Sequence, residues 1–163
     1  MNMRVGHGFD IHPLVQGRAL ILGGVHIASD VGCAGHSDAD VVMHSVADAI
    51  LGACGMGDIG EWFPDDDEEY RGADSAVLLG RVSAAARDVG ARPVNADVTV
   101  YLERPKLADF KAAIRSRLAE ILDLAPACVG FKARTFEGFG AIGAGTACAA
   151  SAVVLIEMAS LSG

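Results

Sequence analysis

Apolar residues recur along this chain with two spacings, and these spacings separate strands from helices. Alternating apolar and polar positions predict strands, whereas apolar positions three and four apart predict helices. Strands are expected at residues 3–8, 97–102, 129–134 and 147–156, with a hairpin at 19–27 broken by Gly23 and Gly24. Helices are expected at 38–53, capped by Ser37 or Asp38, at 74–89, closed by Gly90, and at 107–122.

The order of these elements predicts an α+β fold. Residues 55–73 are rich in glycine, aspartate and proline, which is typical of a mobile loop. The sequence contains neither a linker nor an internal repeat, so residues 1–163 are expected to form a single domain. Its helices are expected to cover one face of its sheet.

The composition is that of a folded, acidic protein. Hydrophobic residues make up 52% of the 163 residues and charged residues 21%, which argues against disorder. Thirteen lysines and arginines stand against 21 acidic residues, and the net charge of −8 makes nucleic acid an unfavourable partner. If the substrate is a phosphate ester, positive charge has to come from metal ions and helix N-termini.

The sequence gives no sign of a membrane segment or of export. Its first residues lead directly into a predicted strand, so we expect neither a signal nor a transit peptide. No apolar run reaches the ~20 residues that a membrane-spanning helix needs. The cysteines, Cys33, Cys54, Cys128 and Cys148, are widely spaced and form no Cys-x-x-Cys pair. We therefore expect reduced thiols and a cytoplasmic protein.

All five histidines lie within the first 44 residues, close to several aspartates. On an extended segment Asp10 and His12 point the same way and can share a bound ion. His44 is the natural third ligand, and an Asp/His/His set leaves the fourth position of a tetrahedral zinc ion open, as catalytic sites require. The plainer interpretation of His44 is a helical histidine that is hydrogen-bonded to a nearby aspartate. His7 and His26 are interpreted as structural.

The predicted helix at 38–53 places Asp40, His44 and Asp48 on one face, which indicates a cleft or an interface. Farther along, Asp58 stands between glycines, where it could hold a sugar hydroxyl or orient a metal-bound group. The acidic run at 65–69 is more typical of a solvated turn, and it lacks the glycine and glutamate of a calcium-binding EF-hand loop.

Two later segments offer groups that suit a phosphate. Residues 103–107 end a strand and open a helix, where backbone N–H groups and Lys106 can meet a phosphate or a base edge. Residues 132–137 supply a hydroxyl and a carboxylate at the end of another strand. Either segment alone is more typical of a surface turn. Together with the first two clusters they form an ordered series.

This series resembles one known family, the 2-C-methyl-D-erythritol 2,4-cyclodiphosphate synthases of the non-mevalonate isoprenoid (terpenoid) pathway. The resemblance covers essentially all of the chain. It rests on residues 6–12, 23–25, 36–40 with 44, 48–53, 57–60, 63–65, 72–75, 105–106 and 132–133. The Ser-Asp-x-Asp-x-x-x-His block from Ser37 to His44 is long and specific.

The resemblance implies a homotrimer with active sites at its subunit boundaries. It also implies a reaction within one molecule of 4-diphosphocytidyl-2-C-methyl-D-erythritol 2-phosphate, catalysed by a phosphorus–oxygen lyase. The 2-phosphate attacks the β-phosphorus, CMP leaves, and a cyclic diphosphate forms. Because phosphate is already an adequate nucleophile, such an enzyme mainly folds the substrate on itself and neutralises charge.

The family's roles fall on matching positions of this sequence. Asp10, His12 and His44 would bind zinc, and Glu137 would help to hold a magnesium or manganese ion on the substrate diphosphate. His36 and Thr135 would stabilise the transition state. The phosphates and the methylerythritol unit would be contacted by Ser37, Asp58, Ile59, Gly60, Phe63, Pro64, Asp65 and Asp67. The cytidine unit would be bound by the neighbouring subunit's Leu102, Glu103, Arg104, Pro105, Lys106, Leu107, Ala108, Ala133, Arg134 and Phe136.

The chain departs from the family's pattern in two places. Arg134 and Phe136 flank Thr135, where members commonly carry threonines. Ala144 and Thr146 replace an arginine and a glutamate at the mouth of a central cavity in which some members hold an isoprenoid diphosphate. Because the anion anchor is lost there, we predict weak or no binding of such a ligand.

Two other functions could use the same residues. A zinc-dependent phosphoesterase would attack with a metal-bound water and release inorganic phosphate or a linear product. A trimeric scaffold with a structural metal would complete the metal's coordination with a fourth protein ligand, and the sequence offers no clear candidate for that ligand. Metal content separates the scaffold from the enzymes, and product identity separates the two enzymes. A fused cytidylyltransferase domain, which some relatives carry, is not expected in a chain of this length.

Overall fold

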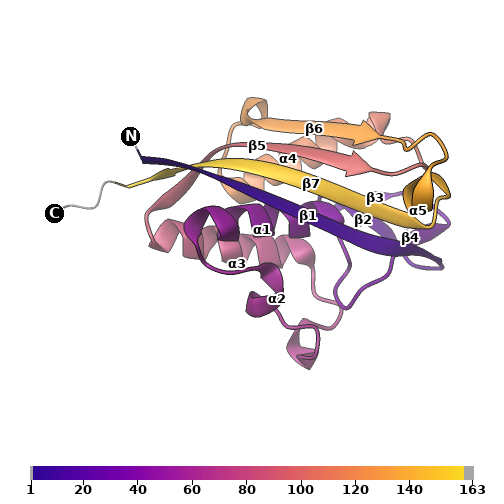
Figure 1. Cartoon of the computed structure of the whole chain (residues 1–163), viewed down its shortest axis with the longest axis horizontal. Helices are drawn as coiled ribbons and strands as arrows, with labels where there is room; N and C mark the ends of the chain where they lie inside the picture. Colours follow the sequence, from indigo (N-terminus) through magenta and orange to yellow (C-terminus); the bar gives the residue numbers. More distant parts are fainter. Residues whose placement is uncertain (1, 160–163) are drawn as a thin grey trace.

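A five-stranded mixed sheet organises the chain (Figure 1). In this computed structural model, which describes residues 2–159, the strands lie in the order β4-β1-β7-β5-β6. Of the four pairs of adjacent strands in this sheet, β5 and β6 run parallel, and the other three pairs are antiparallel. The bounds are β1 (Asn2–Gln16), β4 (Val31–Cys33), β5 (Ala91–Tyr101), β6 (Val129–Arg134) and β7 (Ala147–Met158). A separate hairpin pairs β2 (Leu20–Leu22) with β3 (Val25–Ile27).

The three long helices pack on one hydrophobic core with this sheet. Figure 1 shows α1 (Val41–Cys54) and α3 (Ser75–Asp88) running together along one side of the strands. The parallel strands β5 and β6 are connected through α4 (Lys111–Leu122). Short elements complete the chain, namely α2 (Ile59–Trp62), α5 (Gly140–Gly143) and the 3₁₀ turns at Glu68–Tyr70, Ala108–Phe110 and Pro126–Cys128. No helix among residues 2–159 is long and apolar enough to cross a membrane.

The sheet has two unlike faces, because successive side chains of a strand point in opposite directions. On the helix side, Cys148, Ala150 and Val154 of β7 are fully buried. On the other side, the large apolar side chains Val5, Phe9, Ile11, Val153 and Met3 are exposed. The short helix α5 touches one end of this second face, where Ile142 packs with Ala147, Ala149 and Tyr101.

Helix α1 can lie directly on β1 because the strand has no side chain at Gly6. A Cβ atom placed on Gly6 would lie 1.7 Å from the carbonyl oxygen of Ala49, far inside van der Waals contact. Gly6, Gly8, Asp10 and His12 share this face of the strand, since they alternate along it. Gly6 and Gly8 therefore determine how closely α1 approaches Asp10 and His12.

The structure confirms the predicted α+β class, the hairpin and the strand and helix order. Two strand boundaries, one missed strand and the expected loop differ from the prediction. Strand β1 extends to Gln16 because it pairs with β7 as far as Pro13 and then with β4 from Leu14 to Gln16, and β5 begins at Ala91 because it pairs with the end of β7. Strand β4, with three residues, was missed because so short a run carries no periodicity. The expected loop at 55–73 contains α2 and one 3₁₀ turn.

The start of α1 also differs from the prediction. The N-cap is Asp40 rather than Ser37 or Asp38, because the Asp40 carboxylate accepts the N–H groups of Val42 and Met43. The same carboxylate accepts Gly23 N–H and Gly24 N–H from the hairpin. Burial raises the pKa of Asp40 to about 6, although the backbone donors oppose this shift. Asp40 is thus a buried anchor and does not share an open polar face with His44 and Asp48.

Candidate functional site

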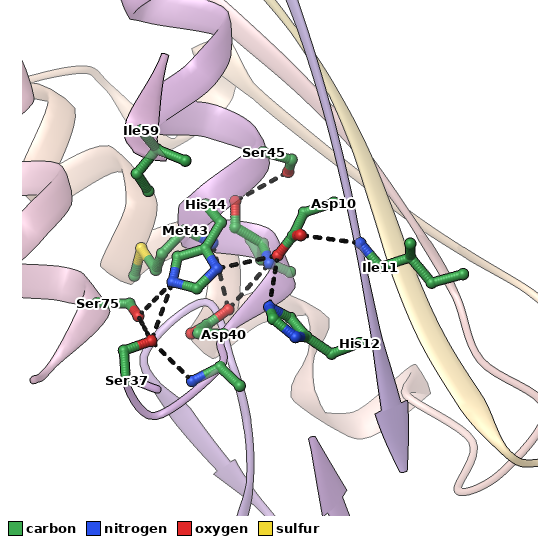
Figure 2. A network of polar contacts seen from close by, with 12 residues as sticks. Asp10, Ile11, His12, Ser37, Asp40, Met43, His44, Ser45, Ile59 and Ser75 are labelled. Carbon is green, nitrogen blue, oxygen red and sulfur yellow. Dashed lines mark hydrogen bonds and ion pairs between the residues drawn. The ribbon is translucent and has the colours of Figure 1, made fainter. Parts of the chain in front are cut away.

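Asp10, His12 and His44 come together where β1 passes under α1. Each offers one ligand atom, and these atoms all lie within 4.8 Å of one another. Oδ2 of Asp10 is 3.1 Å from Nε2 of His12 and 2.9 Å from Nδ1 of His44. Figure 2 shows the two imidazoles meeting this carboxylate from different elements, His12 from the strand and His44 from the helix. The sequence prediction that these three residues converge is confirmed.

The donor set fits a metal ion. Nε2 of His12 is buried, and among the described residues it has no hydrogen-bond partner, because its approach to Asp10 is not aligned as a hydrogen bond. Leaving a buried polar atom without a partner costs about 1–3 kcal/mol, so a bound ion at this atom would relieve it. One carboxylate and two imidazoles are ligands that zinc accepts, and among residues 2–159 these three are the groups that converge there.

The charges within the cluster depend on one another. Burial by itself would raise the pKa of Asp10, but the contacts with His12 and His44 outweigh it and hold that pKa well below its usual range. The contact with the Asp10 carboxylate in turn raises the pKa of His12 above its ordinary value, against the effect of burial. Without a metal ion, the negative charge on Asp10 and a positive charge on His12 thus stabilise each other.

The other ring nitrogen of His44 faces two serines (Figure 2). Nε2 of His44 lies 2.9 Å from Oγ of Ser75 and 3.2 Å from Oγ of Ser37. Ser75 is the first residue of α3 and is fully buried, and Ser37 is also buried. Ser37, which was predicted to contact the phosphates, thus lies next to His44, whereas Ser75 was not singled out by the sequence analysis.

The loop that carries His36 and Ser37 is tied down by Arg18. The guanidinium donates from Nη1 to the Gly35 carbonyl at 3.0 Å and from Nη2 to the Ser37 carbonyl at 2.9 Å. Backbone N–H of Gly72 donates to the His36 carbonyl at 2.8 Å, which ties the loop to the segment before α3. Both carbonyls flanking His36 are thereby fixed, and the loop is held against the metal cluster.

A cavity of about 380 Å³ opens above this cluster. It is lined by Asp10, His12, Gly35, His36, Ser37, His44, Ile59, Gly60, Phe63, Asp65, Tyr70 and Leu78. Most of the residues predicted to contact the phosphates and methylerythritol are therefore in one place. Asp58, Pro64 and Asp67 do not line it. The carboxylates of Asp58 and Asp67 instead cap short helices by accepting Glu61 N–H and Glu69 N–H.

A second cavity, of about 310 Å³, lies where β5 and β6 end. It is lined by Leu102, Pro105, Lys106, Leu107, Ala133, Arg134, Thr135 and Glu137. Thr135 donates its hydroxyl proton to Glu137 at 2.5 Å. Glu103, Arg104, Ala108 and Phe136 belong to the same segments but do not line the cavity. Glu103 instead accepts the N–H of Phe136 at 3.0 Å, and the Phe136 ring packs edge-on against Tyr101.

The two cavities have no lining residue in common among those described. We name them the metal pocket and the phosphate-side pocket. Within one chain, His36 lines the first and Thr135 the second, and Glu137 is likewise separated from Asp10, His12 and His44. The two predicted transition-state residues are therefore not brought together by the fold of a single chain.

Several residues at the site were missed by the sequence analysis. Ser75, Tyr70 and Leu78 reach the metal pocket or its network from the region around the start of α3. The signal that could have found Ser75 was the motif at 72–75, whose last residue it is. His7 and His26 are exposed and lie outside the cluster, consistent with their omission from the predicted metal site.

Known proteins resemble this chain over nearly its whole length. A family model described as the YgbB family matches residues 3–157. A relative from Natranaerobius thermophilus, named 2-C-methyl-D-erythritol 2,4-cyclodiphosphate synthase, is 48% identical over 155 residues, which cover 95% of this chain and 98% of the relative.

Solved structures resemble the fold as closely. The bifunctional IspDF from Campylobacter jejuni superimposes with a TM-score of 0.93 at 40% identity; the match covers 97% of this chain but 43% of that longer protein. A structure titled as 2C-methyl-D-erythritol-2,4-cyclodiphosphate synthase in a CDP-bound form gives a TM-score of 0.88 at 39% identity, covering 94% of this chain and 100% of that one.

Proposed function

This chain belongs to the YgbB family, and from that membership we propose that it catalyses the synthesis of 2-C-methyl-D-erythritol 2,4-cyclodiphosphate. The enzyme converts 4-diphosphocytidyl-2-C-methyl-D-erythritol 2-phosphate into this cyclic product and CMP, a step of non-mevalonate isoprenoid biosynthesis. It is a phosphorus–oxygen lyase. The observation that carries the proposal is the convergence of Asp10, His12 and His44 at the floor of a cavity that also contains His36 and Ser37.

This reaction depends more on holding the 2-phosphate against the β-phosphorus than on acid–base catalysis. An oxygen of the 2-phosphate attacks the β-phosphorus, the bond from that phosphorus to the oxygen bridging the α-phosphate breaks, and CMP leaves with that oxygen. The nucleophile is already an anion, so no residue has to remove a proton from it. Because both groups belong to one molecule, the protein contributes by folding the substrate and fixing its internal rotations with the two groups in contact.

In the metal pocket, Asp10, His12 and His44 would hold zinc. When bound, zinc polarises the β-phosphate oxygens and stabilises the negative charge that develops there. His36 and Ser37 lie on the adjoining loop that Arg18 fixes, and both line the pocket where the phosphates would bind. Ile59, Gly60, Phe63 and Asp65 form the wall on which the methylerythritol unit would rest.

In the phosphate-side pocket, Lys106 brings a positive charge to a chain whose net charge is −8. Thr135 would contact the departing phosphate, and Glu137 would help to hold a magnesium or manganese ion between the α- and β-phosphates. The segments 102–108 and 133–136 would enclose the cytidine, largely through backbone groups. Because Arg134 lines this pocket as well, it adds a second cation where family members commonly carry threonine.

One active site needs both pockets, and we propose that a homotrimer supplies them from neighbouring subunits. The exposed apolar side chains on the second face of the sheet, including Val5, Phe9 and Ile11, support this assembly, because a contiguous apolar patch on a sheet is typical of an interface. The trimer would bury this face and bring the phosphate-side pocket of one subunit over the metal pocket of the next. We place the reaction in the cytoplasm, where the four unpaired cysteines would stay reduced.

Product identity tests the proposed reaction. Phosphorus NMR of the purified protein with 4-diphosphocytidyl-methylerythritol 2-phosphate, zinc and magnesium should give a cyclic diphosphate and equimolar CMP. His44→Ala should abolish both products, whereas His26→Ala, which changes an exposed histidine outside the pocket, should leave them unchanged. Free phosphate or a linear product would replace the proposal with a zinc-dependent phosphoesterase, which uses the same ligands with water as nucleophile.

A further inference from the structure

The hydrogen bonds around Ser75 place a proton on one ring nitrogen of His44. Oγ of Ser75 makes a very short contact with Oδ1 of Asp38, and Ser75 N–H donates to Oδ2 of the same carboxylate at 3.1 Å. A carboxylate only accepts hydrogen bonds, and a hydroxyl has one proton. The Ser75 hydroxyl therefore donates that proton to Asp38 and has only lone pairs left for other partners.

His44 has to donate to Ser75 as a consequence. Its Nε2 lies 2.9 Å from Oγ of Ser75, and a contact of this length between two lone pairs would be repulsive. Nε2 is thus protonated and donates to Ser75. The remaining ring nitrogen, Nδ1, faces the Asp10 carboxylate at 2.9 Å, and it is the nitrogen whose lone pair an ion in the cluster would bind.

Ser37 is compatible with this arrangement. Its Oγ accepts the N–H of Ala39 at 3.1 Å and lies 3.4 Å from Oγ of Ser75. Its own proton can be donated to the second lone pair of Ser75. Oγ of Ser37 lies 3.2 Å from Nε2 of His44, farther than the 2.9 Å of Ser75. Ser75 is therefore the main hydrogen-bond acceptor of Nε2.

From this accounting we propose that Asp38 and Ser75 are positioning residues for the metal ligand His44. The carboxylate fixes the hydroxyl, the hydroxyl fixes the Nε2 proton, and Nδ1 is thereby reserved for the ion. Partners of this kind behind a ligating histidine orient its ring and raise its basicity. The inference rests on the proposed metal site, and it concerns residues that touch neither substrate nor metal.

The same atoms have the spacing of a Ser–His–Asp triad, with 2.9 Å on either side of the His44 ring. The hydrogen bonds exclude this use, because a nucleophilic serine has to give its proton to the histidine. Here the proton of Ser75 goes to Asp38. Moreover, Ser75 is fully buried, so no substrate can reach its Oγ atom.

Zinc affinity tests the proposal without any turnover. In competition with a chromophoric chelator, Ser75→Ala and Asp38→Asn should each weaken zinc binding about 10–100-fold. Ser83→Ala is the matched control, since Ser83 is an equally buried serine of α3 that contacts Arg87 instead, and its zinc affinity should stay within about twofold of the wild type. Unchanged affinity in both Ser75→Ala and Asp38→Asn would overturn the proposal.

Nitrogen-15 NMR of the histidine rings supplies a readout that loss of folding stability does not mimic. In the zinc-loaded wild type, His44 should show a slowly exchanging Nε2 proton and an Nδ1 bound to the ion. In Ser75→Ala that proton should exchange rapidly with water, while the signals from the rest of the chain remain those of the folded protein. Zinc bound through Nε2, or covalent labelling of Ser75 by a fluorophosphonate, would contradict the assignment. If cyclisation failed while these results held, only the proposed reaction would fall.

Discussion

Gly8 of β1 lies so close to Ser45 of α1 that a Cβ atom built on the glycine would be 2.0 Å from the serine carbonyl oxygen. No shift of a flexible side chain can relieve this contact, because the obstacle is helix backbone. Ser45 directly follows His44, and Gly8 lies two residues before Asp10 on the same face of the strand. The contact between strand and helix thus sets the spacing of Asp10 and His44, two of the candidate metal ligands.

Gly8→Ala is therefore predicted to push α1 away from β1. The free energy of unfolding should fall by about 1–3 kcal/mol through overpacking. Zinc affinity should fall at least about tenfold, as expected when ligands lose their support. The control is Gly52→Ala on the exposed side of α1, where a Cβ atom meets nothing within 4 Å. That change should stabilise the helix by about 0.5–1 kcal/mol and leave zinc binding unaltered. A Gly8→Ala variant with normal zinc affinity would contradict the spacing argument.

Asp40→Asn is predicted to loosen the hairpin from α1. Four backbone N–H groups converge on this carboxylate, from Gly23 at 2.9 Å, Gly24 at 2.7 Å, Val42 at 3.0 Å and Met43 at 3.2 Å. An amide has one acceptor oxygen, so one of these donors would face an NH₂ group. The loss should cost about 1–3 kcal/mol in urea unfolding at pH 7.5, partly offset by burying a neutral group.

Asp74→Asn supplies the comparison for that experiment. Asp74 caps α3 by accepting a single N–H, from Ala76, and is exposed. Since asparagine caps helices as well as aspartate does, this variant should unfold within about 0.5 kcal/mol of the wild type. Equal losses in the two variants would mean that the hairpin contacts of Asp40 contribute nothing beyond capping.

The metal-free protein is predicted to show a stability contribution from Asp10 that is confined to a pH window. The pKa of Asp10 is lowered in the folded chain, so its contribution is present above the unfolded value of about 4 and is lost as pH falls. The pKa of His12 is raised, so its contribution is present below about 6.5 and is lost as pH rises through the folded value. The difference in unfolding free energy between wild type and Asp10→Asn should therefore be largest between about pH 4 and 6.5. A difference independent of pH would refute the coupling.

The sequence predicted the parts of this site that depend on residues close together in the chain, and it missed those that depend on distant residues. Asp10 and His12 are two residues apart on one strand, so their convergence was predictable from strand geometry alone. The N-cap role of Asp40 was not, because two of its four donors come from a hairpin 16 and 17 residues earlier in the chain. Ser75 is 31 residues from His44, and only packing of α3 against α1 brings it to the ring.

The second pocket illustrates the same limit. Glu103 and Phe136 were predicted to bind substrate. Instead, Phe136 N–H donates to Glu103, 33 residues away, and residues next to them in the sequence line the cavity. Strand β4 was missed because its three residues form a strand only by pairing with the far end of β1. Residue types in a motif thus predicted the chemistry, whereas long-range pairing decided which member of each segment faces the cavity.

The weak binding of isoprenoid diphosphates remains a prediction, and a variant makes it sharper. Ala144 and Thr146 are exposed at the end of α5, and the Thr146 hydroxyl is occupied by the Ala141 carbonyl at 3.0 Å. Neither side chain offers a cation. The wild type should show no rise in melting temperature with an isoprenoid diphosphate, whereas an Ala144→Arg/Thr146→Glu variant should show one, because ligand binding stabilises the folded state. A strong rise in the wild type would contradict the prediction.

The central claim is that one active site takes its metal pocket from one subunit and its phosphate-side pocket from another. Two inactive variants test it most directly, His44→Ala in the first pocket and Thr135→Ala in the second. After subunits are exchanged at equal amounts, random mixing should restore about one quarter of the wild-type rate of CMP release, because that share of sites pairs two intact pockets. Native mass spectrometry should confirm the mixed assemblies. Mixed assemblies without restored activity would contradict the claim and place the whole site within one chain.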